Sequence, residues 1–168
     1  MDWTTFDKLP DDARVWITGF GRALDENEQH ILVAGMQAFA AGWASHNVPV
    51  QSAFEILHNR FLVISAHTHG VVSGCSVDSM MRNIRELHES IGLAPPGGNL
   101  IFFREENGRI QSIDHLDFRD IAKSGRLKPR TRVFDTLIQN MGQLRSGRFE
   151  ISYEEAWHAR AFPISAPS

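Results

Sequence analysis

The stretch Ser73-Gly74-Cys75-Ser76-Val77-Asp78-Ser79 marks a change from extended chain to helix, and it contains the only cysteine of the sequence. Ser73-Gly74 interrupts a strand pattern, and Ser76 is a residue type that favours the N-cap of a helix. Apolar residues then recur at helical spacing up to a terminating glycine: Val77, Met80, Met81, Ile84, Leu87, Ile91 and Gly92. The stretch predicts a strand-to-helix junction with Cys75 just before the helix.

Cys75 has three interpretations at this junction. A free cysteine is frequently a small buried hydrophobic residue, and this is the interpretation we favour. At the start of a helix the free amides can instead hold an anion, with Cys75 as a non-reactive contact, or they can favour a nucleophilic or redox thiol. Asp78 counts against a thiolate because its carboxylate lies in the first turn.

A second long helix is predicted upstream, beginning at Asp25. Asp25 and Glu28 have the spacing of a capping box, in which each side chain bonds to the other residue's backbone amide. One apolar seam follows, made of Leu32, Met36, Phe39, Trp43 and His46. His46 is interpreted as a polar residue at the edge of the core; the alternative places it in a site shared with Cys75.

Strand patterns complete the predicted fold, which is an α+β domain spanning residues 1–168. We expect a mixed, mostly antiparallel sheet of about five strands, covered by two long helices and accompanied by two shorter ones. The expected core is 10–160, with a loop at 93–98 and a tail at 161–168. The remaining expected elements are a strand at 13–20, hairpins at 50–68 and 100–114, a helix from Asp117 to Ala122 and a last helix at 133–144.

Charge is distributed unevenly along the 168 residues, although the net charge is only −3. Residues 1–30 carry seven acids and three bases, whereas residues 119–148 carry eight bases and two acids. The acidic and basic parts can complement each other within the fold or across a dimer, so a homo-oligomer is possible. Arg126, Lys128, Arg130 and Arg132 occupy alternate positions; we favour a solvated connector there over an anion or nucleic-acid contact. Without an overall basic excess, nucleic acid is an unexpected partner.

Compartment and membrane association follow from what the sequence lacks. A single cysteine cannot form an intramolecular disulfide, and no apolar leader or run of about 18 apolar residues is present. We therefore expect a cytosolic protein without a membrane segment.

Several catalytic and cofactor motifs are incomplete. Gly19-x-Gly21 is followed by Leu24 where a dinucleotide fingerprint needs its third glycine, and no Gly-Lys dipeptide is present to form a phosphate-binding P-loop. His67 and His69 alternate like metal ligands on a strand, but no recognised spacing supplies further ligands. We expect neither a cofactor nor a metal.

The run Gly74-Cys75-Ser76-Val77-Asp78-Ser79 resembles the Gly-Cys-Ser-Ile-Asp run of a family of small bacterial proteins often labelled ABC transporter ATPase. Further similarities are Val15-Trp16-Ile17, Trp43-x-x-His46, Arg60-Phe61 and Trp157-x-x-Arg160. The resemblance covers about residues 3–160 and implies no established activity. Because this sequence lacks a P-loop, the ATPase label does not describe it.

Two functional hypotheses remain. The preferred one is a non-catalytic module that binds an unknown protein or small ligand, because no catalytic constellation is complete. The alternative is a cysteine-dependent enzyme or thiol sensor with Cys75 as nucleophile and His46 or His67 as base. The candidate ligand-binding residues are Trp43, Arg60, Ser73, Gly74, Ser76, Asp78, Trp157 and Arg160.

Overall fold

A computed structural model of the chain describes residues 5–94 and 99–164. The described part begins with a short 3-10 helix, η1 (Phe6–Lys8), and the strand β1 (Arg14–Gly19). The predicted α+β fold class is confirmed. Parts of the predicted loop at 93–98 and tail at 161–168 lie outside the described residues.

The strands form separate antiparallel sheets in place of the single sheet that we predicted. The first large sheet has the order β1-β5-β4, with β4 (Gln51–Leu57) and β5 (Phe61–His67). The second has the order β7-β6-β8-β9, and a two-stranded ribbon, β2-β3, stands apart. The remaining strands are β2 (Ala44–Ser45), β3 (Val48–Pro49), β6 (Leu100–Arg104), β7 (Ile110–Asp114), β8 (Arg132–Phe134) and β9 (Glu150–Ser152).

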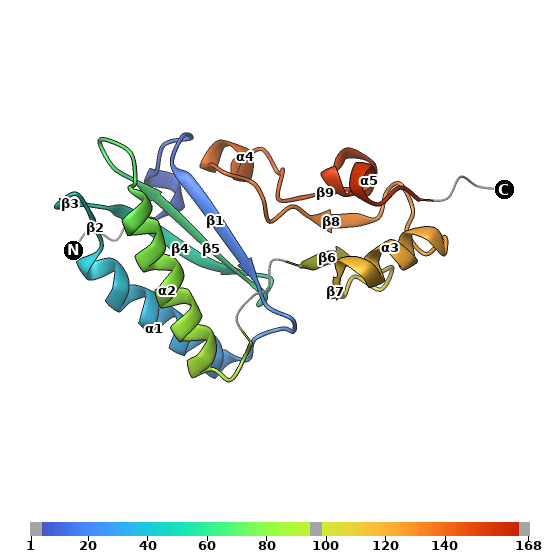
Figure 1. The fold of residues 1–168 in the computed structure, drawn as a ribbon, viewed down its shortest axis with the longest axis horizontal. Helices are drawn as coiled ribbons and strands as arrows, with labels where there is room; N and C mark the ends of the chain where they lie inside the picture. Colours follow the sequence, from blue (N-terminus) through green and yellow to red (C-terminus); the bar gives the residue numbers. More distant parts are fainter. Residues whose placement is uncertain (1–4, 95–98, 165–168) are drawn as a thin grey trace.

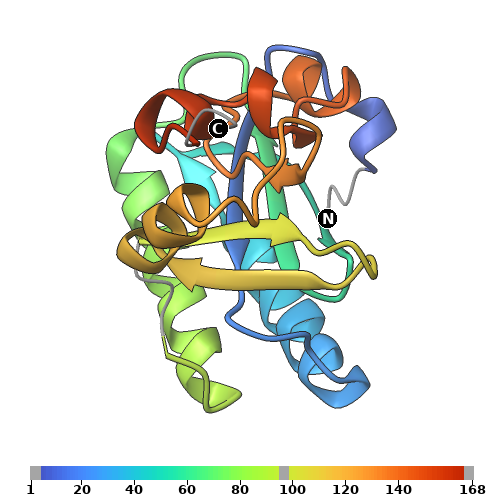
Figure 2. The same ribbon diagram turned by 90° about the vertical axis from the view of Figure 1, so that its right-hand side faces the viewer.

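Four layers follow one another in the order helices, sheet, sheet, helices (Figure 1). Helices α1 (Glu26–Gly42) and α2 (Gly74–Ser90) cover the outer face of the β1-β5-β4 sheet. On the other side, α3 (His115–Lys123) and α5 (Trp157–Ala161) cover the second sheet. The strands β6 and β7 run across the direction of β1 and β5, which is an orthogonal sheet packing (Figure 2).

The core has three apolar clusters, one between each pair of layers, and strand alternation distributes the side chains among them. On β5, Leu62 and Ile64 face the long helices, whereas Phe61 and Val63 face the second sheet. On β6, Phe102 faces the first sheet and Phe103 faces α3. Both sheets are therefore apolar on both faces, which is why β5 reads as an almost continuous apolar run.

Local signals place several helix and turn boundaries correctly. Asp25 and Glu28 form the predicted capping box at the start of α1, and Gly92 follows α2 with a φ of 69°. The two predicted hairpins are also present, as β4-β5 and β6-β7. These features depend only on residues close together in the chain.

Two helix starts are earlier than predicted. Ser73, and not Ser76, is the N-cap of α2, so Cys75 lies in the first turn of the helix. Asp114, and not Asp117, caps α3, because its side chain accepts the backbone amides of Leu116 and Asp117. In each case a cap residue lies three positions upstream of the one we chose.

The predicted helix at 133–144 is wrong. Val133 and Phe134 pair with β6 as part of β8, and Leu137 is exposed in the following turn. The helix α4 (Met141–Arg145) begins only after Asn140, whose side chain accepts the amide of Gln143. Sheet pairing of the β-branched and aromatic residues therefore outweighs their helical spacing.

Gly19 ends β1 and lies against Phe102 of the second sheet. A Cβ atom at this position would lie 2.3 Å from the buried Phe102 ring. We expect Gly19→Ala to lower the free energy of unfolding by about 1–3 kcal/mol, because the ring has no space to move away. Urea unfolding measures this change. Gly21→Ala is the matched control, since a Cβ there meets nothing within 4 Å; equal losses in both variants would contradict the packing explanation.

His158 makes stability depend on pH, because burial lowers its pKa to about 4, with a smaller contribution from repulsion by His115. Between the unfolded pKa of about 6.5 and the folded value, the unfolded chain binds more protons. The stability that neutral His158 contributes is present above pH 6.5 and is lost as the pH falls towards 4. We expect His158→Phe to remove roughly 2 kcal/mol of this acid-side loss in urea unfolding; an unchanged pH slope would contradict the assignment.

Candidate functional site

The serines of the Ser73–Ser79 stretch connect the start of α2 to the chain that follows α1. The Ser73 hydroxyl accepts the amide of Ser76 at 3.3 Å, and the two hydroxyls lie 2.8 Å apart. Ser76 Oγ donates to the carbonyl of Ala44 at 2.9 Å, and the Ser73 amide donates to Ser45 Oγ at 3.0 Å. The hydroxyl groups of Ser73 and Ser76 thus form hydrogen bonds within the protein.

Trp43 belongs to the same network. It is buried, and its indole Nε1 donates to the carbonyl of Ser76 at 3.1 Å. The prediction brought Trp43, Ser73 and Ser76 together as ligand contacts, and the structure does bring them together. Their mutual hydrogen bonds account for all three as a structural connection between α1, β2 and α2.

Cys75 is exposed, so the interpretation that we favoured, a buried hydrophobic residue, is wrong. Gly74 and Asp78 beside it are exposed as well. In the described part of the chain, no hydrogen bond or ion pair joins the Cys75 thiol to another side chain. The hypothesis of a cysteine nucleophile stays a prediction.

His46 is not on α1. It lies in the tight turn between β2 and β3, where His46 and Asn47 have φ values of 51° and 64°. Two successive left-handed residues are typical of a two-residue hairpin turn, and asparagine tolerates this conformation well. The side chain of His46 is exposed, so its predicted place at the edge of the core is wrong.

Arg60 joins the two large sheets. It follows the β4-β5 turn and is only 8% exposed. Its guanidinium donates to the carbonyls of Phe20 at 3.0 Å and Gly21 at 2.6 Å, which follow β1. It also donates to the carbonyl of Ile110 at 2.5 Å and to Ser112 Oγ at 2.8 Å, both on β7. One cation therefore holds three segments that are distant in sequence.

The charge of Arg60 is not balanced by a carboxylate in this cluster. All four acceptors are neutral, and burial together with the nearby charge of Arg109 lowers the pKa of Arg60. Buried charges are usually paired with an opposite charge, because desolvation of an unpaired ion is costly. No carboxylate in this cluster therefore neutralises Arg60, and its positive potential extends into the space beside it.

A groove of about 570 Å³ lies beside Arg60, at the junction of the two sheets. We call it the arginine groove. Its walls come from the loop after β1, the β4-β5 turn and the start of β7, and no Asp or Glu is among its lining residues. Those residues are Gly21, Arg22, Ala23, His58, Asn59, Arg60, Arg104, Gly108, Arg109, Ile110 and Gln111.

Two of these arginines have carboxylate partners at the edge of the groove. Arg22 bonds to Glu28 through two hydrogen bonds of 2.6 and 2.8 Å, and Arg22 lowers the pKa of Glu28 to about 2. Arg104 bonds to both oxygens of Glu150, at 2.9 and 3.0 Å. These pairs hold the guanidinium groups in place beside the cavity.

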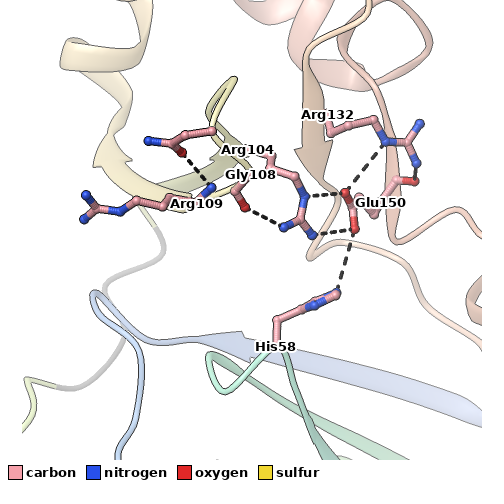
Figure 3. A network of polar contacts seen from close by, with 7 residues as sticks. His58, Arg104, Gly108, Arg109, Arg132 and Glu150 are labelled. Atoms are coloured by element: carbon pink, nitrogen blue, oxygen red, sulfur yellow. Dashed lines mark hydrogen bonds and ion pairs between the residues drawn. The ribbon is translucent and has the colours of Figure 1, made fainter.

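Several basic side chains surround Glu150 (Figure 3). Besides Arg104, it lies 3.7 Å from His58 and 3.7 Å from Arg132, and the hydrogen bond from Arg104 is the largest cause of its lowered pKa. Arg109 points away from this cluster and has no ion pair within the described part of the chain. Cationic groups therefore outnumber carboxylates around the groove.

The other predicted ligand residues lie elsewhere. Trp157 begins α5, where its ring stacks on His158 at 4.0 Å, and Arg160 of the same helix is exposed. The helix α5 covers the second sheet, whereas α2 covers the first (Figure 1). The predicted ligand residues thus fall into three separate places, which are the start of α2, the sheet junction and α5, and the predicted base His46 lies in the β2-β3 turn.

Sequence reasoning missed most of the arginine groove. Of its cationic residues, only Arg60 was a candidate, and Arg22, His58, Arg104 and Arg109 were not. They come from separate segments, so no motif or spacing connects them. The two hairpins predicted at 50–68 and 100–114 are the local signals near the groove, because their turns form part of its lining.

Among residues 5–94 and 99–164, no three His, Cys, Asp or Glu side chains are grouped so that they could hold a metal ion. His67 and His69 line a separate groove of about 510 Å³ together with Asp12 and Arg14. No helix in these ranges is long and apolar enough to cross a membrane.

Comparisons with protein-family models, with curated proteins and with solved structures found no match to this chain. The resemblance to the Gly-Cys-Ser-Ile-Asp proteins stays a prediction.

The neighbours Cys75 and Ser76 provide a direct test of the α2 junction. We expect Ser76→Ala to lower the free energy of unfolding by about 1 kcal/mol, because it leaves the carbonyl of Ala44 without its donor. Cys75→Ser should change it by less than about 0.5 kcal/mol, since Cys75 is exposed. Urea unfolding compares the two variants. A larger loss from Cys75→Ser than from Ser76→Ala would contradict these structural roles.

Proposed function

We propose that the protein is a non-catalytic cytosolic module that binds an anionic ligand, through phosphate or carboxylate groups, in the arginine groove. The observation that carries the proposal is the buried guanidinium of Arg60, which has only neutral hydrogen-bond partners and lies beside a groove without acidic residues.

Electrostatics favours an anion at this position. Burial is the main cause of the lowered pKa of Arg60, and repulsion by Arg109 adds to it. An anion between the two arginines attracts both and so offsets their repulsion, in a groove where a partly buried charge is screened less than on an open surface. The bound anion therefore supplies the negative charge that none of the described carboxylates supplies beside Arg60 and Arg109.

Arginine also matches the geometry of such ligands. The guanidinium presents a planar fork of donors that can engage two oxygens of a carboxylate or phosphate at once. Arg109 is the arginine available for this contact, because Arg22 and Arg104 already bond to Glu28 and Glu150. Those two add positive potential at the edges of the groove.

The residues that line the arginine groove favour a binding role over a catalytic one. The groove contains one histidine and no serine, cysteine, aspartate or glutamate. A reaction by acid-base or nucleophilic catalysis requires at least two such groups in defined positions. A binding role is consistent with this composition.

Binding of citrate and pyrophosphate, measured by isothermal titration calorimetry at low ionic strength, tests the proposal. We expect Arg109→Gln to weaken binding by about tenfold, as the loss of one charge-assisted hydrogen bond implies. Arg82→Gln on α2 removes the same charge away from the groove and is the control. Equal affinity in Arg109→Gln and the wild type, or no binding of either anion, would contradict the proposal. Arg60 is unsuitable for this test because its loss also separates the sheets.

A further inference from the structure

A second basic groove adjoins the first. It has a volume of about 840 Å³ and lies between the β6-β7 hairpin and the loop at 125–132. We call it the loop groove. Its lining residues are Phe103, Arg104, Glu105, Glu106, Asn107, Ile121, Gly125, Arg126, Leu127, Lys128, Arg130, Thr131 and Arg132.

The loop that forms this groove is held in a defined shape. Leu127 is buried and anchors it in the cluster beneath the second sheet. A turn follows, in which the Thr131 amide donates to the carbonyl of Lys128 at 2.9 Å and the Lys128 amide donates to Thr131 Oγ1 at 2.9 Å. The sequence favoured a solvated connector for these cations; the turn at Lys128 and Thr131 instead places all four along one groove.

Positive charge exceeds negative charge here too. Lys128 pairs with Glu106 at 2.5 Å, and Arg132 has only the Glu150 carboxylate that Arg104 and His58 also approach. Arg126 and Arg130 are exposed and make no ion pair with any described residue. Two full positive charges along the loop groove therefore lack a partner within the described chain.

Arg104 lines both grooves, and the β6-β7 hairpin lies between them. We propose that one acidic protein segment, an extended stretch rich in Asp and Glu, binds across both grooves. This inference rests on the proposed anion binding in the arginine groove and identifies the ligand of that site. Carboxylates of the segment contact Arg109 in the first groove and Arg126 and Arg130 in the second.

The composition of the loop groove favours a polypeptide over a nucleic acid. Single-stranded nucleic acids are usually held by exposed aromatic side chains on which bases stack. Among the described residues that line the two grooves, Phe103 is the only Phe, Tyr or Trp and it is buried, and His58 provides the only other ring, which packs against Phe61 and Phe134. Glu105 and Glu106 also lie in the path, where they repel a continuous phosphate backbone but can be avoided by a peptide of mixed sequence.

Fluorescence anisotropy with labelled glutamate peptides tests the inference on the full chain. We expect affinity to rise from diglutamate to octaglutamate, because only the longer peptide reaches both grooves, and to fall with added salt. Arg126→Gln/Arg130→Gln should weaken octaglutamate binding about tenfold while citrate binding stays unchanged. The control, Arg82→Gln/Arg85→Gln, removes two charges from α2.

The outcomes separate this inference from the proposed function. If Arg126→Gln/Arg130→Gln binds octaglutamate as well as the control does, the two-groove segment is contradicted even where Arg109→Gln still reduces citrate binding. Tighter binding of an eight-nucleotide oligothymidylate than of octaglutamate, under the same salt conditions, would replace the peptide by a nucleic acid. An unchanged citrate affinity in Arg109→Gln would contradict the arginine groove itself.

Discussion

The guanidinium of Arg60 connects the two halves of the fold. Its hydrogen bonds reach the loop after β1, a strand of the first sheet, and the strand β7 of the second sheet. Apolar packing between the sheets is non-directional, whereas these hydrogen bonds define which ends of the sheets meet. The crossing of the sheets and the position of the groove at their junction both depend on this contact.

The same contact also produces the electrostatic character of the junction. Three carbonyl oxygens and the Ser112 hydroxyl accept hydrogen bonds from Arg60 but leave its charge in place, so the positive potential extends into the adjacent cavity. Around it, Glu28 and Glu150 orient Arg22 and Arg104 and neutralise part of their charge. The surrounding charges are therefore ordered, and an incoming ligand has few side chains to immobilise.

Sequence reasoning succeeded where short-range chemistry decides the structure. The capping box at Asp25, the glycine end of α2 and the two hairpins follow from residues a few positions apart. It failed where a distant segment decides the structure, since Val133 and Phe134 pair with β6. It also missed three local features: the tight turn at His46 and the helix caps Ser73 and Asp114. The arginine groove combines side chains from several segments, so only the three-dimensional fold makes it visible.

The aromatic side chain of Phe61, next to Arg60, packs with three other rings between the two sheets. The ring of Phe61 lies 4.9 Å from those of Phe102 and Phe134 and 5.1 Å from that of Phe149, and all four rings lie between the sheets. The thickness of this aromatic layer sets the separation of the two sheets, and thereby the width of the groove at their junction. Changes in ring size inside the core can thus alter the width of the groove without altering any residue that lines it.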